Sequence, residues 1–192
     1  MASRFGASRF GASRLVLLVA ILLGALLLGA GCARSIMQSA IVAKHGGHSD
    51  EAEMDFWGEM AKTRSVTNHD ALHAVMLTFH VERTTSDFEV ALASAREHGW
   101  IAADDALPAL ETARIGWIAK AICIETGIKG GVTMRLFGAR ERYAVRELNY
   151  RRWINNMTPA QAVSGLQLIA LLSEAEDFLI GAPSTNPEDL DR

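Results

Sequence analysis

The stretch ALETARIGWIAKAICIE, from Ala109 to Glu125, decides the fold that this sequence predicts. Pro108 precedes it, and Asp104 or Asp105 can act as its N-cap, as is typical of a helix start. Leucine, alanine, tryptophan and isoleucine side chains would occupy nearly every side of this helix. A helix that is apolar all round is buried by others. We therefore expect a central helix with the rest of the chain packed around it.

Further helices are predicted on both sides by capping residues and apolar periodicity. They fall at about 51–62, 68–83, 88–98, 139–153 and 159–179, with a short helix or flexible stalk at 35–44. The alternating run Val132–Phe137 predicts a short strand, one arm of a small β-hairpin. The expected fold is an all-α, single-domain bundle of about five or six helices built from helix-loop-helix units, with this hairpin as its only β-structure.

The N-terminal stretch LVLLVAILLGALLLGAGC, from Leu15 to Cys32, predicts export. Nineteen residues from Leu15 to Ala33 carry no charge, and three arginines precede them: Arg4, Arg9 and Arg14. A basic start, an apolar core and small residues at the exit are typical of a secretory signal. An uncleaved signal-anchor helix is the alternative, because nineteen apolar residues can just span a bilayer.

Gly31 and Cys32 end this stretch, and the ending LLGAGC resembles the lipobox of bacterial lipoproteins. Gly29 stands where the usual box has a branched aliphatic residue. In that family the signal is cut before the cysteine, which then carries acyl chains such as palmitate. The resemblance implies that Cys32 is the lipidation site and the first mature residue. Either anchor would tether the chain to a bacterial membrane in the cell envelope, with the remainder outside the cytoplasm.

The predicted organisation is a signal peptide at 1–31, a lipidated N-terminus and stalk at 32–49, a helical domain at 50–181 and a disordered, acidic tail at 182–192. Three of the 19 basic residues precede Cys32, which leaves 16 against 22 acidic residues and a formal net charge of −6. This balance argues against a nucleic-acid partner. If Cys32 is acylated, Cys123 has no cysteine to pair with and is expected to be a buried, unreactive thiol.

Two segments of the helical domain look alike. ALASAREHGWI at 91–101 and AVRELNYRRWI at 144–154 both read as an amphipathic helix ending in Trp-Ile, and they predict repeat units at 88–125 and 139–179. Chance similarity between helical hairpins is the alternative. The pattern weakly resembles the S-layer homology module, whose I-T-R-A-E-like motif has Thr112-Ala113-Arg114 as its nearest match here. That resemblance implies a helical fold and an envelope setting.

A histidine stripe is the first candidate site. His69, His73 and His80 would lie along one side of one helix, where an i, i+4 pair can bind a zinc-type divalent metal. His45 or His48 could complete the set. The alternative is that these side chains border the core and form hydrogen bonds. An exported metal-binding protein or metalloenzyme is the corresponding functional alternative.

A basic stretch is the second candidate site. The residues singled out for binding an anionic ligand are Lys129, Arg135, Arg146, Arg151 and Arg152. On an otherwise acidic chain such a face could meet lipid headgroups, a cell-wall polymer or an acidic envelope protein. A solvated face with cation–π packing is the alternative.

Sequence motifs for catalysis are absent: there is no G-x-S-x-G elbow, no H-E-x-x-H and no P-loop. No residue is singled out as catalytic, although a triad can assemble from residues that are distant in sequence. We expect no cofactor and a structural or binding role for a membrane-anchored envelope lipoprotein. Its expected partner is the cell wall or another envelope protein.

Overall fold

The computed structural model describes residues 35–45, 49–79 and 85–181, all within the compact unit Ser35–Arg192. The predicted signal peptide, Cys32, His48, His80 and the acidic tail lie outside the described residues. Within these ranges the chain has eight helices and no strand, which confirms the all-α prediction. The helices are α2 (Val42–His45), α3 (Asp50–Lys62), α4 (Asn68–Thr78), α5 (Phe88–Glu97), α6 (Ile115–Glu125), α7 (Val132–Phe137), α8 (Glu141–Tyr150) and α9 (Gly165–Ile180).

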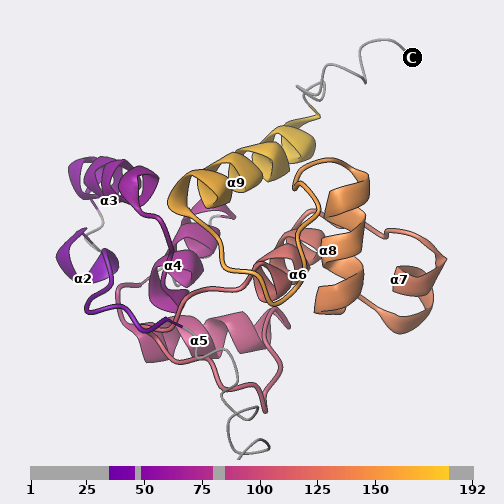
Figure 1. The fold of residues 1–192 in the computed structure, drawn as a ribbon, viewed down its shortest axis with the longest axis horizontal. Helices are drawn as coiled ribbons and strands as arrows, with labels where there is room; N and C mark the ends of the chain where they lie inside the picture. Colours follow the sequence, from indigo (N-terminus) through magenta and orange to yellow (C-terminus); the bar gives the residue numbers. More distant parts are fainter. Residues whose placement is uncertain (1–34, 46–48, 80–84, 182–192) are drawn as a thin grey trace, which may run out of the picture. The chain divides into compact units, whose positions relative to one another are not determined.

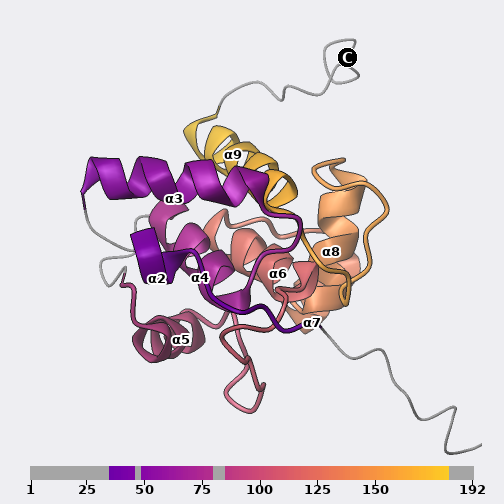
Figure 2. The same ribbon diagram turned by 60° about the vertical axis from the view of Figure 1, so that its left-hand side comes forward.

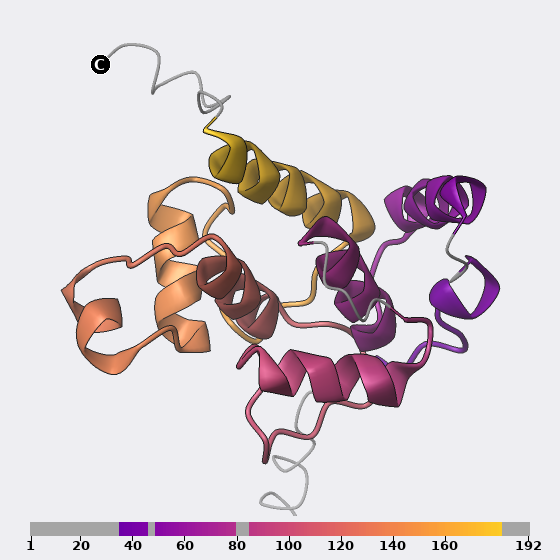
Figure 3. The same ribbon diagram turned by 180° about the vertical axis from the view of Figure 1, so that it is seen from behind.

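Helices α4 and α6 together form the buried centre of this unit. Nine of the eleven residues of α4 are buried, and eight of the eleven residues of α6 are buried because α8 and α4 pack against it. Helix α9 packs on α3 and α4, and α5 packs on α4. Figures 1 to 3 show α9 and α5 on opposite sides of the α4 and α6 pair. The described core runs from Val42 to Ala175, so the unit holds a hydrophobic core of its own.

The predicted central helix begins six residues late. A turn at 109–110 leads into extended backbone at 111–114, and this segment lies beside three other parts of the chain. Ala113 N–H donates to Val66 O at 2.8 Å, and Leu110 O accepts from Met37 N–H at 2.8 Å. These bonds satisfy backbone groups that a helix would have paired internally. The segment around Ser35 and Ile36, predicted as a helix or stalk, is therefore extended as well.

The start of the last long helix also differs from the predicted start at 159, where the sequence offers Thr158 as a cap and Pro159 as a first-turn proline. The carbonyls of Pro159 and Gln161 accept the first N–H groups of α6, at 3.0 and 2.9 Å, so this segment caps another helix. Helix α9 begins at Gly165 behind a capping box in which Ser164 and Gln167 bond each other's backbone N–H. The sequence thus holds two possible helix caps, Thr158 and Ser164. Helix α9 starts at the second one, because the segment after Thr158 is bonded to the start of α6.

The predicted strand Val132–Phe137 is wrong: this run is the six-residue helix α7. A strand needs a hydrogen-bonded neighbour, and no described segment pairs with this run. Only Met134 is buried, on the side of α7 that meets α8. Glycines with positive φ stand on either side of the helix, Gly130 at 57° and Gly138 at 75°.

Helix starts were predicted to within a few residues elsewhere. Thr67 caps α4 as expected, by accepting from Asp70 N–H at 3.0 Å. The sequence offers Asp50 and Ser86 as the caps of α3 and α5, whereas the structure uses Ser49 and Asp87, one residue away in each case. A shift of this size is common because neighbouring polar residues compete for the same backbone donors.

Candidate functional site

Helix α8 builds one side of the candidate site. Its apolar residues Ala144, Val145 and Leu148 are buried and anchor it, because α8 packs on α6. Arg142 and Arg146 are four residues apart, so both project from one side of the helix next to this buried face. The packing therefore fixes the direction in which the two guanidinium groups leave the helix.

The loop after α8 builds the other side. Asn149 holds this loop through its side-chain amide: its Oδ1 accepts from Met157 N–H at 3.1 Å, and its Nδ2 donates to Met157 O at 3.0 Å. The same Nδ2 lies 2.9 Å from Val145 O within the helix. Asn156 has a positive φ of 50°, which turns the chain back toward α8. The loop is thus tied to the helix that carries the arginines.

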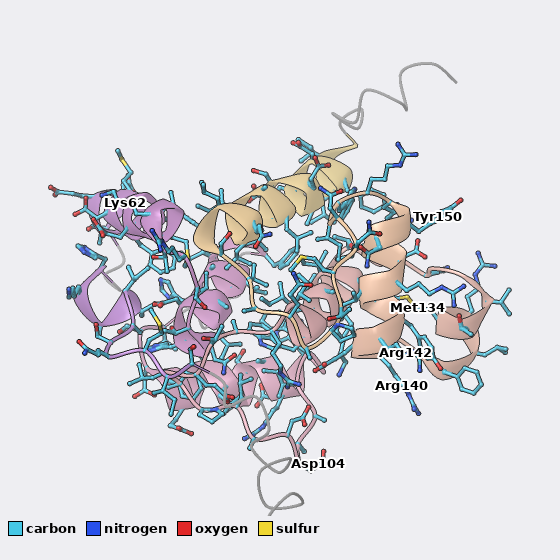
Figure 4. All side chains as sticks on the ribbon, viewed as in Figure 1. Lys62, Asp104, Met134, Arg140, Arg142 and Tyr150 are labelled. Carbon is cyan, nitrogen blue, oxygen red and sulfur yellow. The ribbon has the colours of Figure 1, made fainter. Side chains whose placement is uncertain are left out.

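Between helix and loop lies an open cleft of about 560 Å³. Its wall has two arginines and no carboxylate, so the cleft is electropositive. Arg142 and Arg146 are both exposed, and neither forms an ion pair with any residue that the structure describes. Figure 4 shows Arg142 near one end of α8 and Tyr150 at the other. The lining residues are Arg142, Tyr143, Val145, Arg146, Asn149, Asn156, Met157, Thr158 and Pro159.

Of the predicted basic residues, only Arg146 lines this cleft. Arg151 instead pairs with Glu147, Nε to Oε1 at 3.0 Å, and its guanidinium lies 5.2 Å from the centre of the Phe178 ring. Arg152 is an exposed helix-end residue with a φ of 62°. Lys129 and Arg135 belong to the connection into α7 and to α7 itself. The five predicted residues therefore do not form one continuous basic surface in the structure.

Arg142 and Tyr143 line the cleft but lie outside the five residues predicted to bind the ligand, although Arg142 is one of the seven cations of the basic stretch and Tyr143 shares a helix side with Arg146. The available signal was the i, i+4 spacing of Arg142 and Arg146, which puts two cations on one helical side. The contribution of the loop at 156–159 had no such signal, because it depends on the hydrogen bonds of Asn149.

The histidine stripe has structural contacts. His69 Nε2 lies 3.0 Å from Ser86 O, and His73 Nδ1 lies 3.2 Å from Thr85 O. His73 is buried and meets the Phe56 ring edge-on, with centroids 4.9 Å apart. One nitrogen of each ring thus holds the backbone ahead of α5.

Among the described residues, no three histidine, cysteine, aspartate or glutamate side chains form a group that could hold a metal. His80 lies outside those residues, so a zinc-type site stays a prediction. Cys123 is buried against the core, and burial, together with the nearby Glu147 carboxylate, raises the pKa of its thiol to about 12. At neutral pH this side chain is a protonated thiol and a poor nucleophile.

Comparisons with known proteins add no relative: no family model, curated protein or solved structure matches this chain. In the part of the chain that the structure covers, no helix has the length and apolar content needed to cross a membrane.

Proposed function

We propose that this chain is a membrane-tethered envelope protein whose helical unit binds an anionic cell-wall polymer in the cleft beside α8. The observation that carries the proposal is the pair Arg142 and Arg146, two exposed arginines without an acidic partner among the described residues, on the wall of an open cleft. The tether is the N-terminal apolar stretch, with Cys32 as the acylated residue.

The chemistry of the cleft suits carboxylate or phosphate groups. A guanidinium presents its N–H donors in a planar fork that matches both groups, and charge-assisted bonds of this kind contribute about 1.5–3 kcal/mol each. Tyr143, Asn156 and Thr158 add hydroxyl and amide groups on the same wall, which suit a sugar. The chain as a whole carries a net negative charge, so an anionic polymer would be attracted to locally positive surfaces such as this cleft.

Co-sedimentation with purified cell-wall sacculi tests the binding role. The unit of residues 35–192 should be retained at low salt and released as salt rises, because exposed charges are screened. The variant Arg142→Gln/Arg146→Gln should lose most of this retention. Arg64→Gln is the matched control: Arg64 is exposed and follows Lys62 by two residues in the chain, and Figure 4 shows Lys62 at the opposite side of the unit from Arg142.

Equal retention of the double variant and the control would contradict the cleft assignment. No retention of the unchanged unit at low salt would remove the cell wall as partner.

The tether is tested separately in cells that express the full chain. Cys32→Ala should prevent incorporation of labelled palmitate and release the protein from the membrane fraction. If the Cys32→Ala protein stays in membranes with the electrophoretic mobility of the unchanged protein, the tether is an uncleaved signal anchor and not a lipid.

A further inference from the structure

Helix α7 shows its apolar side chains to solvent. Val132 is 73% exposed and Leu136 71% exposed, and Phe137 is 56% exposed with its ring 6.3 Å from that of Tyr143. The inward-facing residue is Met134, which Figure 4 shows between α7 and α8. In an ordinary surface helix the apolar residues would face the core instead. The outward side of α7 is therefore an apolar surface without a partner in the described chain.

Cations surround this apolar surface. The segment 127–140 contains Lys129, Arg135 and Arg140 and no acidic residue. All three are exposed, and none forms an ion pair with a described residue. Glu147 approaches from α8, but its carboxylate is largely covered and already bonded to Arg151 at 3.0 Å. The local charge is thus positive on a chain whose overall charge is negative.

The position of α7 makes this surface accessible. Figures 1 and 3 show the helix at the edge of the unit, outside α8. Gly130 and Gly138, both with positive φ, set it off from its neighbours. α7 packs on α8 and makes no comparable contact with another described helix. A broad, flat partner could reach it without moving any helix.

We propose that the α7 surface, defined as Val132, Leu136 and Phe137 with Lys129, Arg135 and Arg140, docks on an anionic lipid bilayer. Apolar side chains that enter the headgroup region, flanked by cations that meet anionic lipids, are the chemistry of helices that lie in a membrane interface. A protein partner would instead be expected to cover a larger surface than one helical turn and a half provides.

This inference rests on the membrane tether of the proposed function, and it gives that tether a second contact. A protein held only by its N-terminus is free to rotate above the bilayer. A second apolar and basic contact would fix the orientation of the helical unit on the bilayer.

The test is flotation of the unit of residues 35–192, which holds the whole described core, with lipid vesicles. Vesicles of equal parts phosphatidylcholine and phosphatidylglycerol should carry the unit, and vesicles of phosphatidylcholine alone should carry far less. Val132→Ser/Leu136→Ser should weaken binding roughly tenfold or more, since buried apolar area drives insertion. Arg135→Gln should weaken it about fivefold.

Leu166→Ser is the matched control, because Leu166 is 64% exposed on α9 and should bind as the unchanged unit does. Thermal unfolding checks that each variant keeps its fold. Binding by Val132→Ser/Leu136→Ser equal to that of Leu166→Ser would overturn the proposal. So would loss of vesicle binding in Arg142→Gln/Arg146→Gln, which would assign the lipid to the cleft.

A dimer that Val132→Ser/Leu136→Ser converts to monomers, with vesicle binding unchanged, would also overturn the proposal and make α7 an interface between copies. Failure here is distinguishable from failure of the proposed function. The α7 variants should keep binding to sacculi, and the cleft variants should keep binding to vesicles.

Discussion

The C-terminal ends of α5 and α8, 53 residues apart, have the same backbone conformation but different surroundings. At the end of α5, Trp100 N–H donates to the Ala95 carbonyl five residues back at 2.9 Å. At the end of α8, Trp153 N–H does the same to Leu148 at 3.0 Å. The residue before each tryptophan has a positive φ, 72° at Gly99 and 62° at Arg152. Both are left-handed helix ends of the common type.

The likeness extends to tertiary contacts. Trp100 meets Glu125 and Trp153 meets Phe178, so each tryptophan contacts the residue 25 positions further on. Trp100 is fully buried, and its indole N–H donates to Glu125 Oε1 at 2.7 Å. Trp153 is only partly buried, edge-on to Phe178 with centroids 5.7 Å apart. That the units are a duplication stays a prediction.

The comparison shows that the local sequence determines the geometry of the turn, whereas the surroundings of the turn determine what its tryptophan contacts. In the first region the turn places the large Trp100 side chain in the core, where the Glu125 carboxylate accepts a hydrogen bond from its indole N–H. In the second it places a tryptophan near the surface, beneath the Arg151 guanidinium at 5.9 Å. The second region also lines the cleft, so part of its surface is open to a ligand, whereas the corresponding surface of the first region is buried in the core.

Truncating the two tryptophans should separate the regions most strongly. Trp100→Ala should lower the free energy of unfolding by about 3–5 kcal/mol, because it empties a buried site. Trp153→Ala should cost about 1–2 kcal/mol, because part of that ring is already in water. Urea unfolding followed by circular dichroism measures both. Equal costs would show that the two turns play the same role.

Changing the residue that each tryptophan meets should have the next largest effect. Glu125→Ala leaves the Trp100 N–H without its acceptor and should cost about 1–3 kcal/mol. It also removes the contact of the Glu125 carboxylate with His98 Nδ1 at 3.1 Å. Glu125→Gln keeps an acceptor and serves as the control. A Glu125→Ala protein as stable as the Glu125→Gln protein would mean that water replaces the carboxylate.

The left-handed residues should respond in opposite directions. No atom lies within 4 Å of a Cβ built on Gly99, so Gly99→Ala tests backbone strain alone and should cost about 1 kcal/mol. Arg152→Gly relieves the same strain. Glycine also gives the unfolded chain more conformational freedom, which offsets part of the gain, so the net stabilisation should be about 0.5 kcal/mol. Thermal melting can resolve both shifts. Destabilisation by Arg152→Gly would show that its side chain holds the turn.

The smallest effect should come from Arg151, which touches both Glu147 and the Trp153 ring. Arg151→Ala should cost about 0.5–1 kcal/mol, because partly exposed ion pairs and cation–π contacts are weak. The cost should fall as salt rises. Sacculus binding should stay unchanged in this variant, which separates Arg151 from the cleft arginines.

The fold could be predicted where the signal was local. The Thr67 cap and the left-handed Gly99 mark helix ends through short-range geometry, and both stand in the structure. The strand prediction at 132–137 failed because alternation over six residues does not separate a strand from a short helix without a partner. The helix prediction for residues 109–114 failed because the hydrogen-bond partners of this segment are distant in sequence.

The candidate site could be predicted only in part. The sequence marked the basic stretch and singled out Arg146, but it grouped Arg146 with Arg151. Which arginine is open to a ligand depends on Glu147, on Phe178 and on the loop that Asn149 holds. Those contacts join two helices and a loop, and helical spacing alone does not report them.

By itself the sequence determined that the described chain is all-α, with α6 as a buried helix, because apolar content and capping act over a few residues. Only the tertiary structure decided where two helices begin, that Val132–Phe137 is a helix facing solvent, and that Arg142 and Arg146 have no acidic partner among the described residues. The physical reason is range. Periodicity and caps act along one helix, whereas burial, ion pairing and the shape of a cleft depend on residues that only folding brings together.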